Sequence, residues 1–281
     1  MIDAYIDRLD DELRARGVPG STRRRIRAES TDHLRSDRDA ESRFGEPAVI
    51  AQRFADELGT TAALRNARRS FGALAFAGLV FGALAAGWVG ARWPHGIAVL
   101  SAPQAAVIAF TAVAPQVSFV SGALALLRAL RRRGRSVLPS AEVAVIRHRV
   151  GVALAAGIVS VAAAASFCAT FTAHLPAWSM PVAVAGCTTS AALLSACFIA
   201  LVRESRLRVE QPGGAGDVFD DLGADVSSVF AGSPWLFASV VATIVGAAVF
   251  VPGLLADDGF DGALRGLAEA AACFGGYAVF N

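Results

Sequence analysis

The sequence predicts an all-α, polytopic membrane protein, in which a bundle of six spanning helices follows a small cytoplasmic N-terminal domain of three helices. Two observations lead to this fold class. Of the 281 residues, 54% are hydrophobic and only 18% are charged, whereas ordinary soluble domains carry about 25% charged residues. The first 70 residues hold 14 of the 26 basic residues, and long apolar runs follow. Such runs are typical of membrane-spanning helices.

The first element is a short amphipathic helix. Its apolar residues recur at helical spacing, and they are Ile2, Tyr5, Ile6, Leu9 and Leu13. Gly17 and Pro19 are expected to end it, because neither residue continues a helix well.

Two further helices complete the predicted N-terminal domain, residues 1–60. The second carries Ile26 and Leu34 on its inner face. The third begins at Pro47, since proline is tolerated at the first helical position, and Gly59 is expected to end it. Its apolar stripe consists of Ile50, Phe54 and Leu58. Residues 61–70 are then predicted to be a basic juxtamembrane linker.

Six later segments are apolar enough to cross a membrane, which takes about 20 mostly apolar residues per helix. They cover residues 71–90, 104–127, 150–173, 181–202, 235–255 and 264–280. The last is the weakest, because it is short and contains Arg265 and Glu269. Residues 71–281 are therefore predicted to form the transmembrane domain.

The arginines predict the orientation of these spans. Thirteen arginines lie immediately before the first span and in the loops after the second and fourth spans, whereas Arg92 and Arg265 lie on the other side. Arginine near the end of a span is retained on the cytoplasmic side. We therefore expect a multi-pass protein of the cell membrane with its N-terminus and C-terminus in the cytoplasm.

A cytoplasmic amphipathic helix is predicted near residues 217–231, between the fourth and fifth spans. Its apolar face includes Phe219 and Leu222, and its polar face carries several aspartates. Anionic lipid does not attract an acidic face, so this helix is expected to pack on protein. Phe219 and Leu222 are therefore candidate partner-binding residues.

Four arginines at the start of the second helix are the other candidates for partner binding. They are Arg23, Arg24, Arg25 and Arg27. They could contact an acidic protein partner or anionic lipid, or they could form a solvated face. The formal net charge of the chain is only +2, so no nucleic-acid partner is expected.

Polar residues inside the spans are the first place to look for chemistry. The candidates are Gln104, Gln116, Arg265 and Glu269. Each glutamine follows a proline, which favours helix kinking or termination over a substrate site. Arg265 and Glu269 are four residues apart and can pair on one helix face, and an ion or proton role for them is the less favoured interpretation.

Sequence patterns typical of enzymes and metal sites are missing. The chain contains no HExxH, GxSxG or Walker-type motif. Its four cysteines lie in apolar runs without a CxxC pair, which indicates small buried side chains rather than a metal site. We expect a protein that is not an enzyme and that holds no cofactor or metal.

The N-terminal region also carries a family resemblance in three stretches. These are AYIDRLDDEL, RRRIRAESTDHL and RFGEPAVIAQRFADEL. Residues 1–60 resemble the HAAS signalling domain and its relative, the permease prefix domain, and the last stretch is the most specific. The resemblance implies a cytoplasmic interaction or regulatory module of bacterial membrane proteins, often linked to PadR-like transcriptional control. It assigns no catalytic residues.

These observations favour a membrane protein of regulatory or signalling type, whose N-terminal domain binds a cytoplasmic or membrane protein. The alternative is a transporter or permease subunit, with the N-terminal domain as a gate or assembly module. The lipid bilayer is a partner in both hypotheses. A homo-oligomer is an open alternative, because small residues such as Gly78 and Gly82 let helices approach closely.

Overall fold

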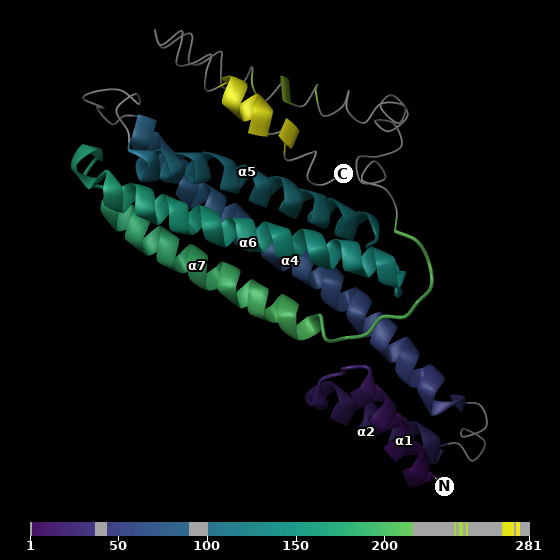
Figure 1. Ribbon diagram of the computed structural model, residues 1–281. Helices are drawn as coiled ribbons and strands as arrows, with labels where there is room; N and C mark the ends of the chain where they lie inside the picture. The colour runs from purple at the N-terminus through teal and green to yellow at the C-terminus, as the bar shows by residue number, and fades with distance from the viewer. Residues whose placement is uncertain are drawn as a thin grey trace. The chain divides into compact units, whose positions relative to one another are not determined.

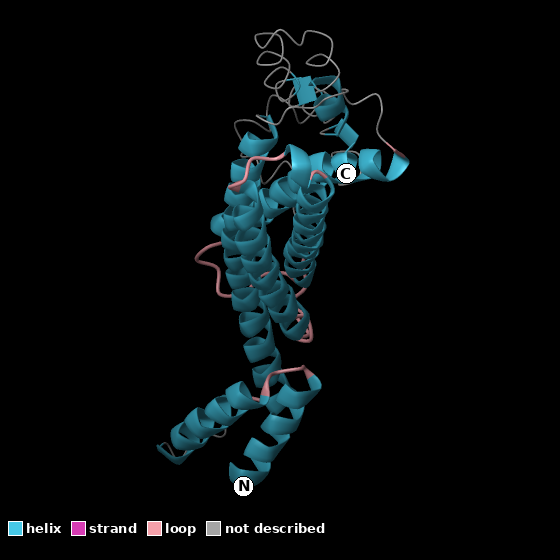
Figure 2. Ribbon diagram, turned by 90° about the vertical axis from the view of Figure 1, so that its left-hand side faces the viewer, coloured by secondary structure: helices cyan, strands magenta, loops and turns pink. Residues whose placement is uncertain are grey.

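The computed structural model describes residues 2–36, 44–89, 101–215, 239, 242–243, 246, 266–272 and 274–275. Within these ranges the chain is all-helical, with helices and loops but no strand (Figure 2). The helices are α1 (Ile2–Ala15), α2 (Gly20–Ser36), α4 (Pro47–Val89), α5 (Ala102–Arg131), α6 (Ser140–Thr170) and α7 (Ser179–Glu204), with a 3-10 turn at Thr172–His174 (Figure 1). The predicted all-α class is confirmed for the described part.

Four helices in the described part have the length and composition needed to cross a membrane. Their apolar stretches are Pro47–Ala85, Ala106–Arg131, Ser140–Thr170 and Ser179–Glu204. They overlap the first four predicted spans. The fifth and sixth predicted spans lie largely outside the described residues, so the six-span count stays a prediction, as do the orientation of the termini and the amphipathic helix near 217–231.

Helix α4 departs from the expectation at its middle. It begins at Pro47 as predicted, but it continues for 43 residues to Val89. The predicted end at Gly59 is wrong, and residues 61–70 are helical. Gly59 serves a close approach instead, because a Cβ atom there would collide with the side chain of Val209. A glycine inside a helix costs up to about 1 kcal/mol relative to alanine. Here the segment that carries Val209 passes so close to α4 that a glycine is required.

The chain forms two compact units, through both of which α4 to α7 run. The first comprises Met1–Ala73, Gly122–Leu154 and Ala192–Ala215, and the second comprises Leu74–Ser121, Ala155–Ala191 and Gly216–Asn281. The second unit has an apolar cluster of its own around Leu84, Ala164 and Cys168.

The core of the first unit is built from the N-terminal helices. The α1 stripe predicted from the sequence is confirmed, because Tyr5, Ile6, Leu9 and Leu13 are all buried. They pack with Ile26 and Leu34 of α2 and with Ala51, Ala55 and Ala62 of α4. The predicted α4 stripe lies at the edge of this core, where Ile50, Phe54 and Leu58 are only partly buried. The more buried face of α4 therefore lies one residue further along and carries small and polar side chains.

Candidate functional site

The candidate site is the junction between the N-terminal helices and residues 205–211, which follow α7 and are called the anchoring segment. Leu207 of this segment is buried in the core formed by α1, α2 and α4, with 6% of its surface exposed. Burying a leucine side chain contributes about 1.5–3 kcal/mol. A residue that follows the fourth candidate span thus completes the core of the first sixty residues.

The backbone of the anchoring segment is held by the turn after α1. The Arg208 N–H donates to the Arg16 carbonyl oxygen at 3.1 Å. Gly17, with φ of +78°, follows at once, and a Cβ atom there would collide with the carbonyl oxygen of Arg206. Gly17 is therefore required twice, for a left-handed backbone conformation and for the passage of the anchoring segment.

Polar side chains on α1 and α4 continue the attachment. Asp56 is only 3% exposed, and its Oδ1 accepts from the Glu210 N–H at 2.9 Å and from Gln52 Nε2 at 2.8 Å. The Arg16 guanidinium donates to the Gln52 side chain and to Glu210 Oε2, the latter at 3.1 Å. Buried polar groups without partners are costly, and here Gln52 and the anchoring segment together satisfy Asp56 on the buried face of α4.

The end of α7 is fastened by a second set of contacts. Arg147 of α6 donates to the carbonyl oxygens of Glu204, at 3.1 Å, and Leu207, at 3.3 Å. A cation at this position satisfies the last carbonyls of a helix and complements its dipole. The Glu204 carboxylate accepts from Arg65 at 2.7 Å and from Asn66 at 2.6 Å, both on α4. The C-terminus of α7 is thereby connected to α4 and α6.

The loop between α5 and α6 closes the same region. Thr60 Oγ1 on α4 accepts from the Leu138 N–H at 2.9 Å. The Ser140 N–H donates to the Gln211 carbonyl oxygen at 2.9 Å, at the end of the anchoring segment. Leu138 is a loop residue and Ser140 is the first residue of α6, so neither N–H group takes part in the backbone hydrogen bonds of a helix.

A buried ion pair joins α5 and α6 beside this junction. Arg128 Nε and Nη2 donate to Glu142 Oε1 and Oε2 at 2.8 and 3.0 Å, with both side chains only 2% exposed. Arg132 Nε reaches the same Oε1 at 3.2 Å. Such a bidentate arginine–carboxylate pair is strong and geometrically specific. Glu142 is the only acidic residue between Arg128 and Arg149, and this isolation in an Arg-rich loop is a signal that could have identified it.

The structure places the predicted arginine cluster on α2, partly in contact with α1. Arg23 pairs with Asp10 at 2.9 Å, and Arg27 pairs with Asp7 at 3.3 Å. Arg25 pairs with Glu29 on its own helix, and Arg24 is exposed. The Arg23–Asp10 pair is mostly buried, whereas the pairs of Arg25 and Arg27 are exposed and contribute about 0–1 kcal/mol each. The exposed arginines of the cluster therefore remain accessible to a partner. The other two candidates for partner binding, Phe219 and Leu222, lie outside the described residues.

The intramembrane candidates separate into two kinds. Gln104 Oε1 accepts from the N–H and the hydroxyl of Ser101, both at 2.9 Å. Because Ser101 immediately precedes α5, the bond from its N–H to Gln104 is one half of a capping box. This position at the start of a helix accounts for Gln104. Gln116 Nε2 donates to Glu269 Oε2 in the second unit. Arg265, the predicted partner of Glu269, lies outside the described residues.

Sequence patterns did not predict the residues that hold the anchoring segment, Arg16 and Asp56. They also did not predict Asn66, which holds the end of α7, or Thr60, which holds the loop before α6. In the described ranges, no group of three or more His, Cys, Asp or Glu side chains is placed to hold a metal ion. No protein-family model, curated protein or solved structure matches the chain.

Proposed function

We propose that this is a multi-pass membrane protein of regulatory type, in which α1, α2 and the N-terminal part of α4, within residues 1–60, form a cytoplasmic helical domain that binds a protein partner. One observation carries the proposal: Leu207, three residues after α7, is part of the core of α1, α2 and α4. A shift at the end of α7 therefore acts directly on the packing of the N-terminal helices. The resemblance of residues 1–60 to HAAS and permease prefix domains supports the interaction role.

The partner surface in this proposal is the outer face of α2. Its inner face is occupied by Ile26 and Leu34, whereas Arg24 and Arg25 are exposed. An acidic surface on the partner would complement these charges and accelerate association. The ion pairs of Arg23 and Arg27 with α1 keep α2 in place while Arg24 and Arg25 remain accessible.

Charge reversal on α2 tests this proposal in the full-length chain. Arg24→Glu combined with Arg25→Glu should remove a co-purifying partner from isolated membranes. The matched control is Arg14→Glu combined with Arg53→Glu, which makes the same charge change at exposed positions outside the cluster. The control should retain the partner. Identical partner lists for the native chain and both double variants would contradict the proposal.

A transporter or permease subunit is the second candidate function, and one contact favours it. The Glu269 carboxylate accepts from Gln116 of α5, and carboxylates within spans commonly belong to ion or proton pathways. In vesicles containing the purified protein and a pH-sensitive dye, Glu269→Gln should abolish any proton flux. The exposed Glu29→Gln should leave it unchanged. Vesicles that show no flux above protein-free vesicles would count against transport of protons.

A further inference from the structure

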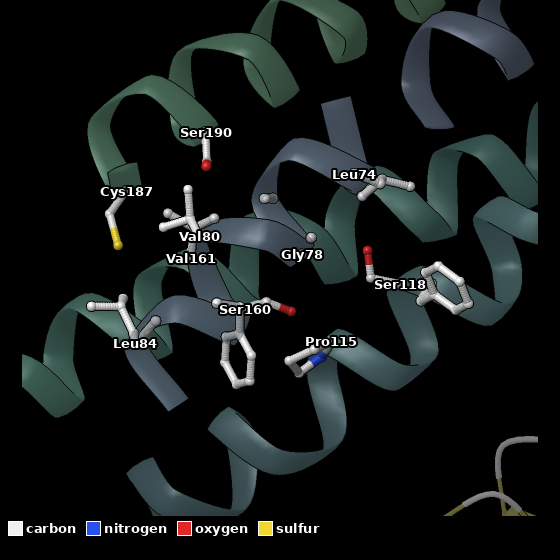
Figure 3. A pocket seen from close by; sticks show the side chains of 15 residues that line it. Leu74, Gly78, Val80, Leu84, Pro115, Ser118, Ser160, Val161, Cys187 and Ser190 are labelled. Carbon is white, nitrogen blue, oxygen red and sulfur yellow. The ribbon is translucent and has the colours of Figure 1, made fainter. Parts of the chain in front are cut away.

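The second unit contains a cavity of about 60 Å³ among α4, α5, α6 and α7 (Figure 3). Its walls are mostly apolar and include Leu84, Pro115 and Val161. Gly186 lets α7 approach Val80 of α4 closely, since a Cβ atom at residue 186 would collide with the Val80 side chain. At Gly78, by contrast, an added Cβ atom would have open space around it, with no described atom within 4 Å.

One buried hydroxyl group in this cavity has no hydrogen-bond partner in the described part of the chain. Ser190 is 1% exposed, and its Oγ is unpaired. Figure 3 shows this hydroxyl directed from α7 toward Val80, into the cavity. By contrast, Ser160 Oγ donates to the Ala156 carbonyl oxygen of its own helix at 2.8 Å. A buried hydroxyl without a partner carries a desolvation cost, and a ligand in the cavity would remove it.

The volume and chemistry of the cavity limit what this ligand can be. A water molecule needs about 10–15 Å³ of such volume, and a benzene-sized ligand needs a cavity of about 150 Å³. A water in a buried site also needs about 2–4 polar partners. Three helices each contribute one serine to the walls, namely Ser118, Ser160 and Ser190. The bond from Ser160 to Ala156 leaves the oxygen of Ser160 able to accept.

We propose that this cavity is a hydration site, which binds one or two water molecules with Ser190 Oγ as the principal ligand. The chemical class of ligand is a neutral, water-sized molecule that can both donate and accept.

Radiolytic hydroxyl-radical labelling of the full chain in lipid vesicles tests the proposal, because radicals formed from a bound water modify the side chains beside it. Cys187 lines the cavity, and Cys168 belongs to the same apolar cluster without lining the cavity. Both thiols are buried and neither is part of a disulfide, so Cys168 is the matched control. Cys187 should be modified several-fold faster than Cys168.

Two variants give the assignment to Ser190 its own test. Ser190→Ala removes the ligand group and Gly78→Val fills the cavity, and each should reduce the labelling of Cys187 to the rate of Cys168. Ser190→Thr keeps the hydroxyl and should preserve fast labelling. Equal labelling of the two cysteines in the native chain would overturn the proposal. Labelling of Cys187 that stays fast in both Ser190→Ala and Gly78→Val would also overturn it.

Discussion

Replacing Glu142 by glutamine should destabilise the protein strongly. The glutamine has nearly the same shape, but it presents a neutral amide to the Arg128 guanidinium, which is bonded to both carboxylate oxygens in the native protein. Because the side chains of Arg128 and Glu142 are each only 2% exposed, water cannot take over the role of the lost charge.

The expected loss follows from the burial of the pair. Removing one partner of a buried ion pair costs about 3–5 kcal/mol, because the remaining charge is left uncompensated. Arg132 makes the effect asymmetric, since it also contacts Glu142 and its side chain is 28% exposed. Arg128→Met therefore leaves a carboxylate that still has a partner, and we expect it to cost less than Glu142→Gln. Glu142→Leu combined with Arg128→Met should recover most of the loss, as replacement of a whole buried pair often does.

The free energy of unfolding can be measured by SDS-induced unfolding in mixed micelles, followed by far-UV circular dichroism. Arg65→Ala is the matched control, since Arg65 pairs with Glu204 at 2.7 Å but is 48% exposed. This more exposed pair should contribute about 1 kcal/mol or less. If Glu142→Gln cost no more than Arg65→Ala, the reasoning from burial would be refuted.

Three further predictions use the same assay. Leu207→Ala should cost about 2–5 kcal/mol, as expected for a core leucine, and a loss below that range would mean that the anchoring segment contributes little to the N-terminal core. Gly59→Ala should be destabilising by about 1–3 kcal/mol because of its collision with Val209, despite the better helix propensity of alanine. In a Val209→Ala background the same substitution should stabilise α4, and an unchanged sign would exclude the steric explanation. Gln104→Ala should cost only about 1 kcal/mol, since it removes the side-chain hydrogen bonds with Ser101 at the start of α5; a much larger effect would indicate a further role for Gln104.

Sequence periodicity was a good guide where a helix has one apolar face and one environment. The stripe on α1 consists of large side chains that meet a single core, and four of its five predicted members are buried. Pro47 likewise begins α4 because the preference of proline for a first helical position is local. Properties of this kind depend only on neighbours within a few residues.

The attachment of the anchoring segment could not be derived in this way. The hydrogen bond between Arg16 and Arg208 and the one between Asp56 and Glu210 join residues far apart in sequence. A Gly in a helical pattern usually indicates an end, and the alternative at Gly59 depends on a distant residue that passes over it. The charges of Arg128 and Glu142 were visible, but only the packing of α5 on α6 shows that they are buried together.

The insertion of Leu207 also has a consequence for the order in which the protein matures during synthesis. The stretch between Ala62 and Leu207 takes roughly 7 to 30 seconds to translate at about 5–20 residues per second. Throughout that interval the core of the N-terminal helices lacks one of its members. The N-terminal core can therefore be completed only after the intervening helices have been synthesised. A chain truncated before residue 207 would expose the apolar surface that chaperones and proteases recognise.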